Sequence, residues 1–492
     1  MDAGEITSLE LTKACLDRIK EVNGKLNALL TVCEDEALAA AKVADERRAK
    51  GEKGGVLGVP FVAKDNMMTK GVRTTAASKI LENYVAPFDA TIIRKLKEAG
   101  AVLLGKANMD EFAHGGSGEN SAFGPAHNPY DLERVPGGSS SGSGAAVAAD
   151  MCIFALGTDT GGSIRCPASF CNIFGLKPTY GRSSRFGLLA MTSSNDCPGP
   201  LTKTAEDAGT VLSVIAGHDK YDATTPNEPV PDYAQEMNNS PLSRGVAEGR
   251  GVLSGFKVGL PIFTPPLQGG DGGGLYGGLS EGVKKALQEA KAKLVELGAE
   301  LVDITLPHAK YAIPVYYIIT PSEISSNLAR FDGVKYGFSS QEAKELGEVY
   351  TKSRGQGFGK ETKRRIMLGT YALSAGYRDA YYLKAQKVRT KIKEELDAAL
   401  KEIDVILTPT QPTAAYKIGA YDADPLQMYL EDIFVAPASM AGLPAISVPG
   451  GFDNGLPVGL QIIGPRFGES KILNVADALE KTNDFIEKKP NI

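Results

Sequence analysis

The sequence predicts an α/β fold: a single large layered domain in which helices cover a mixed, mostly parallel central sheet. Segments with helical periodicity are repeatedly followed by short apolar runs rich in β-branched residues, which is the pattern of a layered sheet. No repeat of fixed period divides the 492 residues. We therefore expect one domain over residues 1–492 rather than an array of small units.

The N-terminal elements are predicted from local signals. Thr7 and Glu10 have the spacing of a capping box, so a helix should begin after Thr7, and Asn23–Gly24 should end it. Residues 34–50 predict a second, Ala-rich helix. Residues 58–64 change to β-branched and aromatic side chains bounded by Gly and Pro, which predicts a short buried strand.

Helix and strand alternate along the rest of the chain. The predicted pairs are helix 91–99 with strand 101–106, helix 281–297 with strand 301–304, and helix 384–401 with strand 404–407. Gly100 and Gly298 stop the first two of these helices. Residues 226–251 and 268–278 are rich in Gly, Pro, Asn and Ser, and we expect them to be loop insertions at the surface of the domain.

Composition excludes several classes of protein. With 42% apolar and 23% charged residues, the chain is not expected to be mainly disordered. Its longest apolar run is too short to cross a membrane, and its net charge of −5 argues against a main role in holding nucleic acid. Six cysteines without paired spacing predict reduced thiols, so we expect a cytoplasmic protein.

Two Gly/Ser-rich stretches, residues 136–144 and 157–165, are the most unusual part of the chain. A predicted helix opening near Gly144 and a predicted strand over 152–156 lie between them. In an α/β layer this arrangement can bring both loops to one edge of the sheet. Because no GxxxxGK[S/T] string occurs, phosphate binding is a weak candidate and a nucleophilic serine is the alternative.

Two familiar serine motifs fit poorly. Residues 138–142 match GxSxG with Ser140 as nucleophile, but that motif needs a preceding strand and a later catalytic histidine. Only His218 and His308 follow, and each is explained more simply as a surface or core histidine. Residues 254–257 match SxxK, a string short enough to arise by chance.

A serine that lacks a histidine needs another base, and a neutral lysine can serve. Lys64 ends the predicted apolar strand, which would carry its amine into the interior, where burial lowers a lysine pKa. A lysine that reaches solvent at the strand end is the other interpretation. Taken alone, the residues around Lys64 favour the lysine that reaches solvent, and only the motifs described next reverse this.

Longer motifs carry a resemblance to a known family. Lys64-Asp65-Asn66 and the strings at 137–140 and 157–168 resemble the amidase signature family, and the similarity runs from about residue 5 to about residue 475. Within that family, the strings at 108–112 and 363–369 resemble the glutaminase subunits of tRNA-dependent amidotransferases. The resemblance implies the amidase signature fold.

The resemblance also implies a catalytic set. Ser163 corresponds to the nucleophile, Ser139, after a cis peptide bond, to the bridging serine, and Lys64 to the base. An oxyanion hole and a supporting group complete the set. The oxyanion hole comprises the backbone amides of Thr160, Gly161 and Gly162, and the supporting group comprises Ser140, Asp159 and Arg165.

Substrate selection is expected from Tyr316, Arg365 and Asp432, which match residues that hold free glutamine. A guanidinium suits the α-carboxylate of glutamine, and a carboxylate suits its α-ammonium. Arg364 is an alternative to Arg365, because the two are adjacent. The chain departs from the family pattern at His114, beside the expected pocket.

The implied reaction supplies ammonia for the ATP-dependent conversion of Glu-tRNA(Gln) to Gln-tRNA(Gln). We expect no metal or cofactor in this chain, with ATP and Mg²⁺ used by a partner, and a heterotrimer with amidotransferase subunits B and C, the tRNA being held mainly by the partner. Two alternatives stay open: a stand-alone amidase of the same family acting on another amide, and a non-catalytic nucleotide-binding or scaffold protein. A complete set of Lys64, Ser139 and Ser163 argues against the second.

Overall fold

The computed structural model describes residues 1–239, 252–262, 278–421 and 423–492. Within these residues one eleven-stranded sheet runs through the molecule in the order β1-β3-β2-β4-β6-β5-β10-β11-β9-β7-β8. The strands are β1 (Leu29–Val32), β2 (Pro60–Lys64), β3 (Val102–Ala107), β4 (Phe154–Asp159), β5 (Phe174–Lys177), β6 (Cys197–Thr202), β7 (Lys257–Ile262), β8 (Glu300–Thr305), β9 (Val405–Pro409), β10 (Ala445–Asp453) and β11 (Leu456–Ile463).

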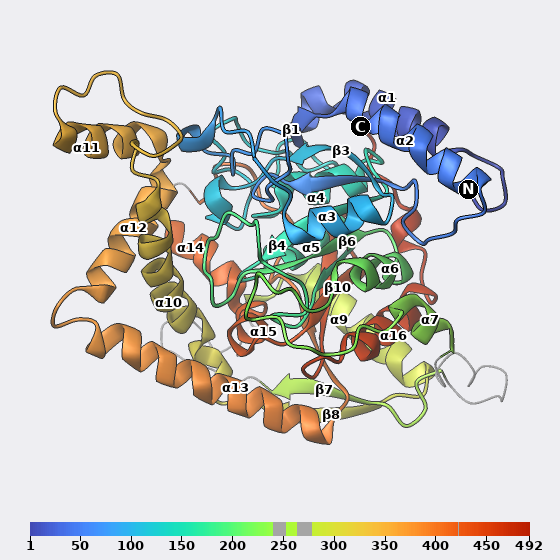
Figure 1. Ribbon diagram of the computed structural model, residues 1–492. Coiled ribbons are helices and arrows are strands. Elements are labelled where there is room, and N and C mark those ends of the chain that lie inside the picture. The colour runs from blue at the N-terminus through green and yellow to red at the C-terminus, as the bar shows by residue number, and fades with distance from the viewer. Residues whose placement is uncertain (240–251, 263–277, 422) are drawn as a thin grey trace.

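Helices cover the sheet and extend beyond it (Figure 1). They are α1 (Ser8–Leu26), α2 (Glu34–Ala49), α3 (Thr91–Glu98), α4 (Ser141–Ala148), α5 (Arg165–Phe170), α6 (Ala205–Ile215), α7 (Tyr233–Asn239), α9 (Glu281–Glu296), α10 (Ala312–Asn327), α11 (Leu346–Gly357), α12 (Lys360–Leu373), α13 (Lys384–Glu402), α14 (Pro425–Leu430), α15 (Ala436–Ala441) and α16 (Glu469–Glu480). In the described part of the chain, no helix combines the length and apolar character needed to cross a membrane.

Parallel pairing occurs in two blocks of the sheet, β3–β2–β4 and β9–β7–β8. The strands between these blocks pair antiparallel, as does β1 at the edge. The prediction of a mixed sheet in an α/β domain is confirmed, with its parallel pairs confined to the two blocks. At the β10–β11 hairpin, Asn454 and Gly455 have φ angles of 51° and 82°, the conformation that a tight antiparallel turn requires.

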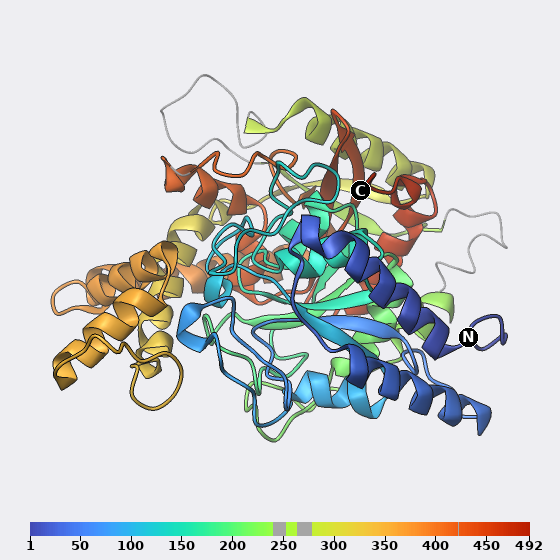
Figure 2. The same ribbon diagram turned by 90° about the horizontal axis from the view of Figure 1, so that it is seen from above.

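The sheet has a core on each face because side chains alternate along its strands. Phe61 of β2 and Leu156 of β4 join the cluster under α3, α6, α9 and α16. Val62 and Ala155, one position away on the same strands, join the cluster under α1, α2 and α4. Helices α10–α13 gather at one side of the molecule, away from α1 and α2 (Figures 1 and 2).

Most predicted elements of the N-terminal half are present, with two corrections. The capping box is confirmed, because the Thr7 hydroxyl accepts from the Glu10 amide at 3.1 Å. However, α1 does not end at Asn23–Gly24: the Asn23 side chain bonds the backbone of Leu29, and the helix continues to Leu26, where Asn27 adopts a left-handed conformation. Helix α4 begins at Ser141, three residues before the predicted opening.

The predicted alternation is also confirmed around α3, α9 and α13, each followed by a strand. The first predicted insertion is partly wrong, because residues 233–239 form α7. The Tyr233 ring is buried and its hydroxyl accepts from Arg182 Nε at 2.7 Å, which holds this segment against the domain. Residues 240–251 and 268–277 of the two predicted insertions lie outside the described residues.

Candidate active site

Two parallel neighbouring strands end at the same edge of the sheet. Strand β2 ends at Lys64 and strand β4 at Asp159. The loop after β4 leads to Ser163, and the loop before α4 ends at Ser140. The Ser140 amide donates to the Ser163 carbonyl at 3.1 Å, so the two Gly/Ser-rich loops meet, as the sequence predicts.

Lys64 lies inside the protein and contacts the first of these loops. Its side chain is fully buried, and Nζ is 2.8 Å from Ser139 Oγ and 3.0 Å from Thr158 Oγ1. The Gly138–Ser139 peptide bond is cis. Burial lowers the pKa of Lys64 to about 7, although the carboxylates of Asp110 and Asp159 act in the opposite direction. Near neutral pH a large share of this amine is therefore uncharged and able to accept a proton.

Ser163 is the more accessible of the two serines. It keeps 6% of its surface exposed, whereas Ser139 is completely buried and lies against Lys64. Ser163 is therefore the serine that keeps some contact with solvent, while Ser139 is in contact with the base. This division suits one serine that attacks and one that relays a proton.

The amides of the 160–163 loop are not equivalent. The Gly162 N–H donates to Asp159 Oδ1 at 2.8 Å. The N–H groups of Thr160, Gly161 and Ser163 have no hydrogen-bond partner among the described residues. The hydrogen of the Gly162 amide is thus directed at a carboxylate, whereas those of Thr160 and Gly161 are free. The oxyanion hole of Thr160, Gly161 and Gly162 stays a prediction.

Asp159 and Arg165 form a buried ion pair that holds this loop. Arg165 Nε lies 2.9 Å from Asp159 Oδ2, and the guanidinium also donates to the Ser439 hydroxyl at 2.8 Å. Burial alone would raise the pKa of Asp159, but the charge of Arg165 lowers it to about 2. The Ser140 hydroxyl stays close to the backbone of Thr158, 3.3 Å from its N and O atoms. Asp159 thus contacts the loop backbone directly, Arg165 acts on it through Asp159, and Ser140 contacts the end of β4.

A second cluster from the helical side of the molecule reaches the same loop. A Cβ atom on Gly161 would lie 2.5 Å from the ring of Tyr316, which shows how closely α10 approaches the 160–163 loop. The neighbouring Tyr317 donates its hydroxyl to Asp432 at 2.8 Å. Arg365 of α12 lies over the Tyr317 ring, 5.4 Å from its centroid. The three predicted glutamine-binding positions therefore belong to one cluster.

The two adjacent arginines of α12 have different surroundings. The Arg365 side chain is 3% exposed and donates Nε to Glu361 Oε1 at 2.8 Å, inside the cluster. The Arg364 side chain is 33% exposed and pairs with the other oxygen of Glu361. Burial raises the pKa of Asp432 to about 7, with the Tyr317 hydrogen bond and the charge of Arg365 opposing that rise. A ligand that brings a cation to Asp432 would favour its charged form.

Two buried carboxylates of this site were not identified from the sequence. Asp110 accepts the amides of Gly118 and Asn120 at 3.0 and 2.9 Å, and its own amide donates to the Ser139 carbonyl at 3.2 Å. Asp196 accepts the Thr160 hydroxyl at 2.6 Å. Burial raises the pKa of both carboxyls to about 6. Asp110 lies in the 108–112 string, but nothing in the sequence pattern singles out Asp196.

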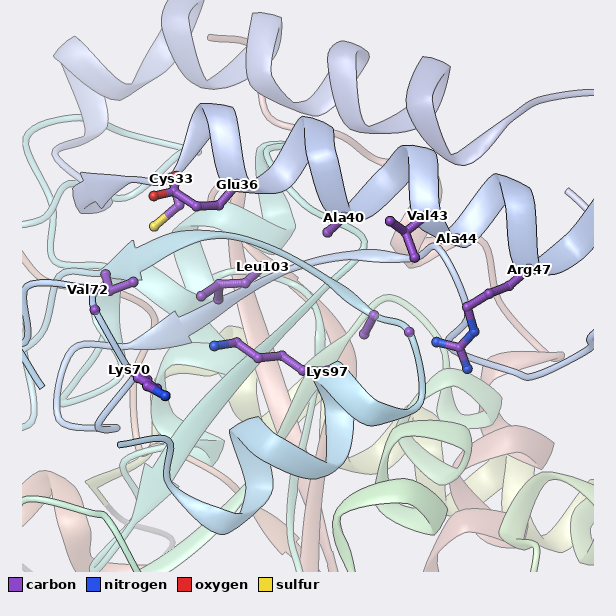
Figure 3. Close-up of a pocket in the computed structure, with 13 residues that line it drawn as sticks. Cys33, Glu36, Ala40, Val43, Ala44, Arg47, Lys70, Val72, Lys97 and Leu103 are labelled. Atoms are coloured by element: carbon purple, nitrogen blue, oxygen red, sulfur yellow. The ribbon is translucent and has the colours of Figure 1, made fainter. Parts of the chain in front are cut away.

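Another hollow, of about 380 Å³, lies between α2 and the C-terminal end of α3 (Figure 3). Arg47 and Lys97 at its rim are already paired with Glu52 and Asp89. Burial raises the pKa of Cys33 in its lining, so this thiol is not activated as a nucleophile. The hollow therefore lacks the acid–base chemistry of the Lys64 centre.

Comparisons with known proteins agree on one family. The family described as Amidase matches residues 10–473. The A subunit of glutamyl-tRNA(Gln) amidotransferase from Carboxydothermus hydrogenoformans is 52% identical over 491 residues, which is 100% of this chain and 97% of the relative. The crystal structure of the protein of the same name from Thermotoga maritima is 43% identical, with a TM-score of 0.77, covering 97% of this chain and 95% of that one. The native peptide amidase of Stenotrophomonas maltophilia is 31% identical, with a TM-score of 0.80, covering 100% and 96%.

Proposed function

The chain belongs to the amidase family, and we propose that it is the glutamine-hydrolysing subunit of a glutamyl-tRNA(Gln) amidotransferase. As such it is an enzyme that takes part in carbon–nitrogen bond formation with glutamine as the amide donor. Relatives named as the A subunit of this enzyme share about half of their residues with the chain over almost its whole length. The observation that carries the chemistry is the buried amine of Lys64 at 2.8 Å from Ser139 Oγ.

In the proposed mechanism Ser163 Oγ attacks the side-chain carbonyl of glutamine. Its proton passes to Ser139 Oγ, and the Ser139 proton passes to the neutral amine of Lys64. When the C–N bond breaks, the relay returns a proton to the leaving nitrogen, so that ammonia departs and an ester of Ser163 remains. Water then hydrolyses this ester by the same relay and releases glutamate.

The oxyanion of each tetrahedral intermediate is stabilised by backbone amides. The free N–H groups of Thr160, Gly161 and Ser163 supply the donors, and one such donor contributes about 3–4 kcal/mol. Gly162 contributes by holding the loop through Asp159 rather than by contacting the oxyanion. Arg165 fixes the carboxylate that does this, so both members of the ion pair act on the geometry of the loop.

The buried cluster of α10 and α12 supplies specificity for a free amino acid. Arg365 binds the α-carboxylate, Asp432 binds the α-ammonium, and Tyr316 lies between the cluster and the nucleophile loop. We assign the carboxylate contact to Arg365 rather than Arg364, because only Arg365 is buried in the cluster. An amide without these two charged groups would leave both side chains buried without their ligands, which costs affinity.

Ammonia must then reach a second active site. We propose that this chain forms a heterotrimer with subunits B and C in the cytoplasm, where the partner uses ATP and Mg²⁺ and holds most of the Glu-tRNA(Gln), while this chain itself uses no cofactor. Exposed aromatic side chains on the helical side, Tyr371, Tyr377 and Tyr381, cluster with ring centroids 4.5–6.2 Å apart and offer an apolar surface for such a partner.

The experiment is amidation of Glu-tRNA(Gln) by the chain co-expressed with subunits B and C. Ser163→Ala should abolish amidation with glutamine as donor and leave amidation with added ammonium salt intact. Loss of both reactions would contradict the proposed division of labour. Hydrolysis of another amide in preference to glutamine, with no response to charged tRNA, would instead indicate a stand-alone amidase.

A further inference from the structure

His114 is a buried histidine that the proposed reaction does not use. Its ring is completely buried, and Nδ1 lies 3.0 Å from the Thr362 hydroxyl oxygen. The other ring nitrogen, Nε2, has no hydrogen-bond partner among the described residues. A buried polar atom without a partner is costly, and such atoms are rare in folded proteins. Nε2 therefore calls for an explanation.

The neighbouring hydrogen bonds determine which nitrogen carries the hydrogen. The Thr362 hydroxyl donates its one hydrogen to Glu111 Oε2 at 2.5 Å. Glu111 also accepts from the Ser78 hydroxyl at 2.5 Å and from the Gly359 amide at 2.8 Å, as expected of a carboxylate. Burial raises the pKa of Glu111, and the hydrogen bonds from Ser78, Thr362 and Gly359 oppose that rise by favouring its charged form. With the carboxylate charged, Thr362 accepts from Nδ1–H of the histidine. Nε2 is left without a hydrogen and is a pure acceptor.

The charge state of His114 agrees with this assignment. Burial and the nearby positive charge of Arg365 both lower its pKa well below the usual histidine value. The imidazole is thus neutral at physiological pH. A neutral ring with a fixed Nδ1–H presents a lone pair to any donor that approaches Nε2.

The loop that starts at His114 borders the cluster of Tyr316, Arg365 and Asp432, the predicted glutamine-binding positions. Thr362 and Arg365 lie one turn apart on the same side of α12. Two residues after the histidine, a Cβ on Gly116 would lie 3.9 Å from Asp432 Oδ1. The Gly116 carbonyl accepts from the Gly138 amide at 2.7 Å, next to Ser139. This loop therefore extends from Arg365 past Asp432 to the serine centre.

We propose that Nε2 of His114 accepts a hydrogen bond from the α-ammonium of bound glutamine, which makes His114 a specificity-determining residue for α-amino amides. A primary ammonium has three hydrogens, and the carboxylate of Asp432 does not use all of them. The neutral imidazole supplies an acceptor for one more. This inference rests on the proposed function, because it assigns a contact to the same substrate.

The test compares two substrates in the co-expressed complex: glutamine, and 4-carbamoylbutanoate, which is glutamine without its α-amino group. His114→Met replaces the ring by an apolar side chain of similar size. We expect it to raise KM for glutamine at least about tenfold, as for loss of one hydrogen bond to a charged group, and to leave KM for the analogue unchanged. His114→Gln keeps an acceptor and should restore much of the glutamine affinity.

Controls separate this contact from a structural role. The Tm of the His114→Met complex should equal or exceed that of the unmodified complex, because the variant removes a buried unpaired acceptor. His308→Met makes the same change at a histidine that pairs with Glu395 outside the site, and neither KM should move. An equal rise in KM for both substrates, or an unchanged KM for glutamine, would overturn the inference. If the unmodified complex hydrolyses no glutamine at all, the proposed function itself is wrong.

Discussion

Lowering the pH from 8 to 6 should remove most of the glutaminase activity in a way that identifies Lys64 as the base. With a pKa of about 7, its neutral fraction falls from about 0.9 to about 0.1 over this range. We therefore expect kcat to fall about tenfold. The sign follows from burial: a lysine whose pKa is lowered is active above that pKa and inactive below it.

The dependence of kcat/KM on pH should be steeper. In the free enzyme Asp432, whose pKa is about 7, must also be ionised to bind the α-ammonium of glutamine. In the complex with glutamine the ammonium keeps this carboxylate charged, so of these two groups only Lys64 contributes to the kcat profile. Two groups that titrate together give a fall of about a hundredfold in kcat/KM between pH 8 and pH 6.

Initial rates of ammonia release over a range of glutamine concentrations, measured on the complex with its partner subunits, would give both profiles. Asp432→Asn should reduce the slope of the kcat/KM profile to that of one group. Glu480→Gln is the matched control, because Glu480 also has a pKa raised to about 7 but lies on α16, where it accepts the Ala205 amide. A kcat that stays constant from pH 6 to pH 8, or that keeps rising above pH 9, would refute the assignment of Lys64.

Three further substitutions, two of them with a matched control variant, test other parts of the site. Ser139→Ala removes the group between the base and the nucleophile, so glutamine hydrolysis should fall at least about a thousandfold while ammonium-supported amidation of the tRNA persists. Arg365→Leu should raise KM for glutamine about tenfold to a hundredfold, whereas Arg364→Leu should raise it less than twofold. Similar KM values for the two variants would argue against the assignment of the α-carboxylate contact to Arg365. Gly161→Ala places a Cβ 2.5 Å from the Tyr316 ring and should lower kcat about a hundredfold. Its control is Gly347→Ala, where the added Cβ meets open space and kcat should not change.

The elements predicted best from the sequence are those whose signals are local. The capping box before α1, the Ala-rich α2 and the apolar strand that ends at Lys64 depend on residues within a few positions of one another. The end of α1 was missed, because the Asn23 side chain bonds the backbone of Leu29 rather than stopping the helix. A local signal for an antiparallel pair, Asn454–Gly455 between apolar runs, was present but unused.

The parts of the site predicted from the sequence are those that stand in contiguous motifs. Lys64, Ser139 and Ser163 each lie in such a motif, and the structure brings Lys64 into contact with Ser139 and joins the loops of the two serines. Asp110 and Asp196 were not identified, because their importance arises from partners that are distant along the chain. The use of the Gly162 amide by Asp159 likewise depends on backbone directions that no residue pattern specifies.

The sequence by itself determined the family and most of the local elements, and it predicted the candidate reactive side chains, because these depend on residue identity and short-range spacing. The tertiary structure decided which of two adjacent arginines faces the cluster, since neighbours on a helix point about 100° apart and only the packing of α12 selects one. It also decided that Lys64 is buried, and burial is what lowers the pKa of its amine to about 7. A lysine becomes a base only in such surroundings, which the whole fold has to supply.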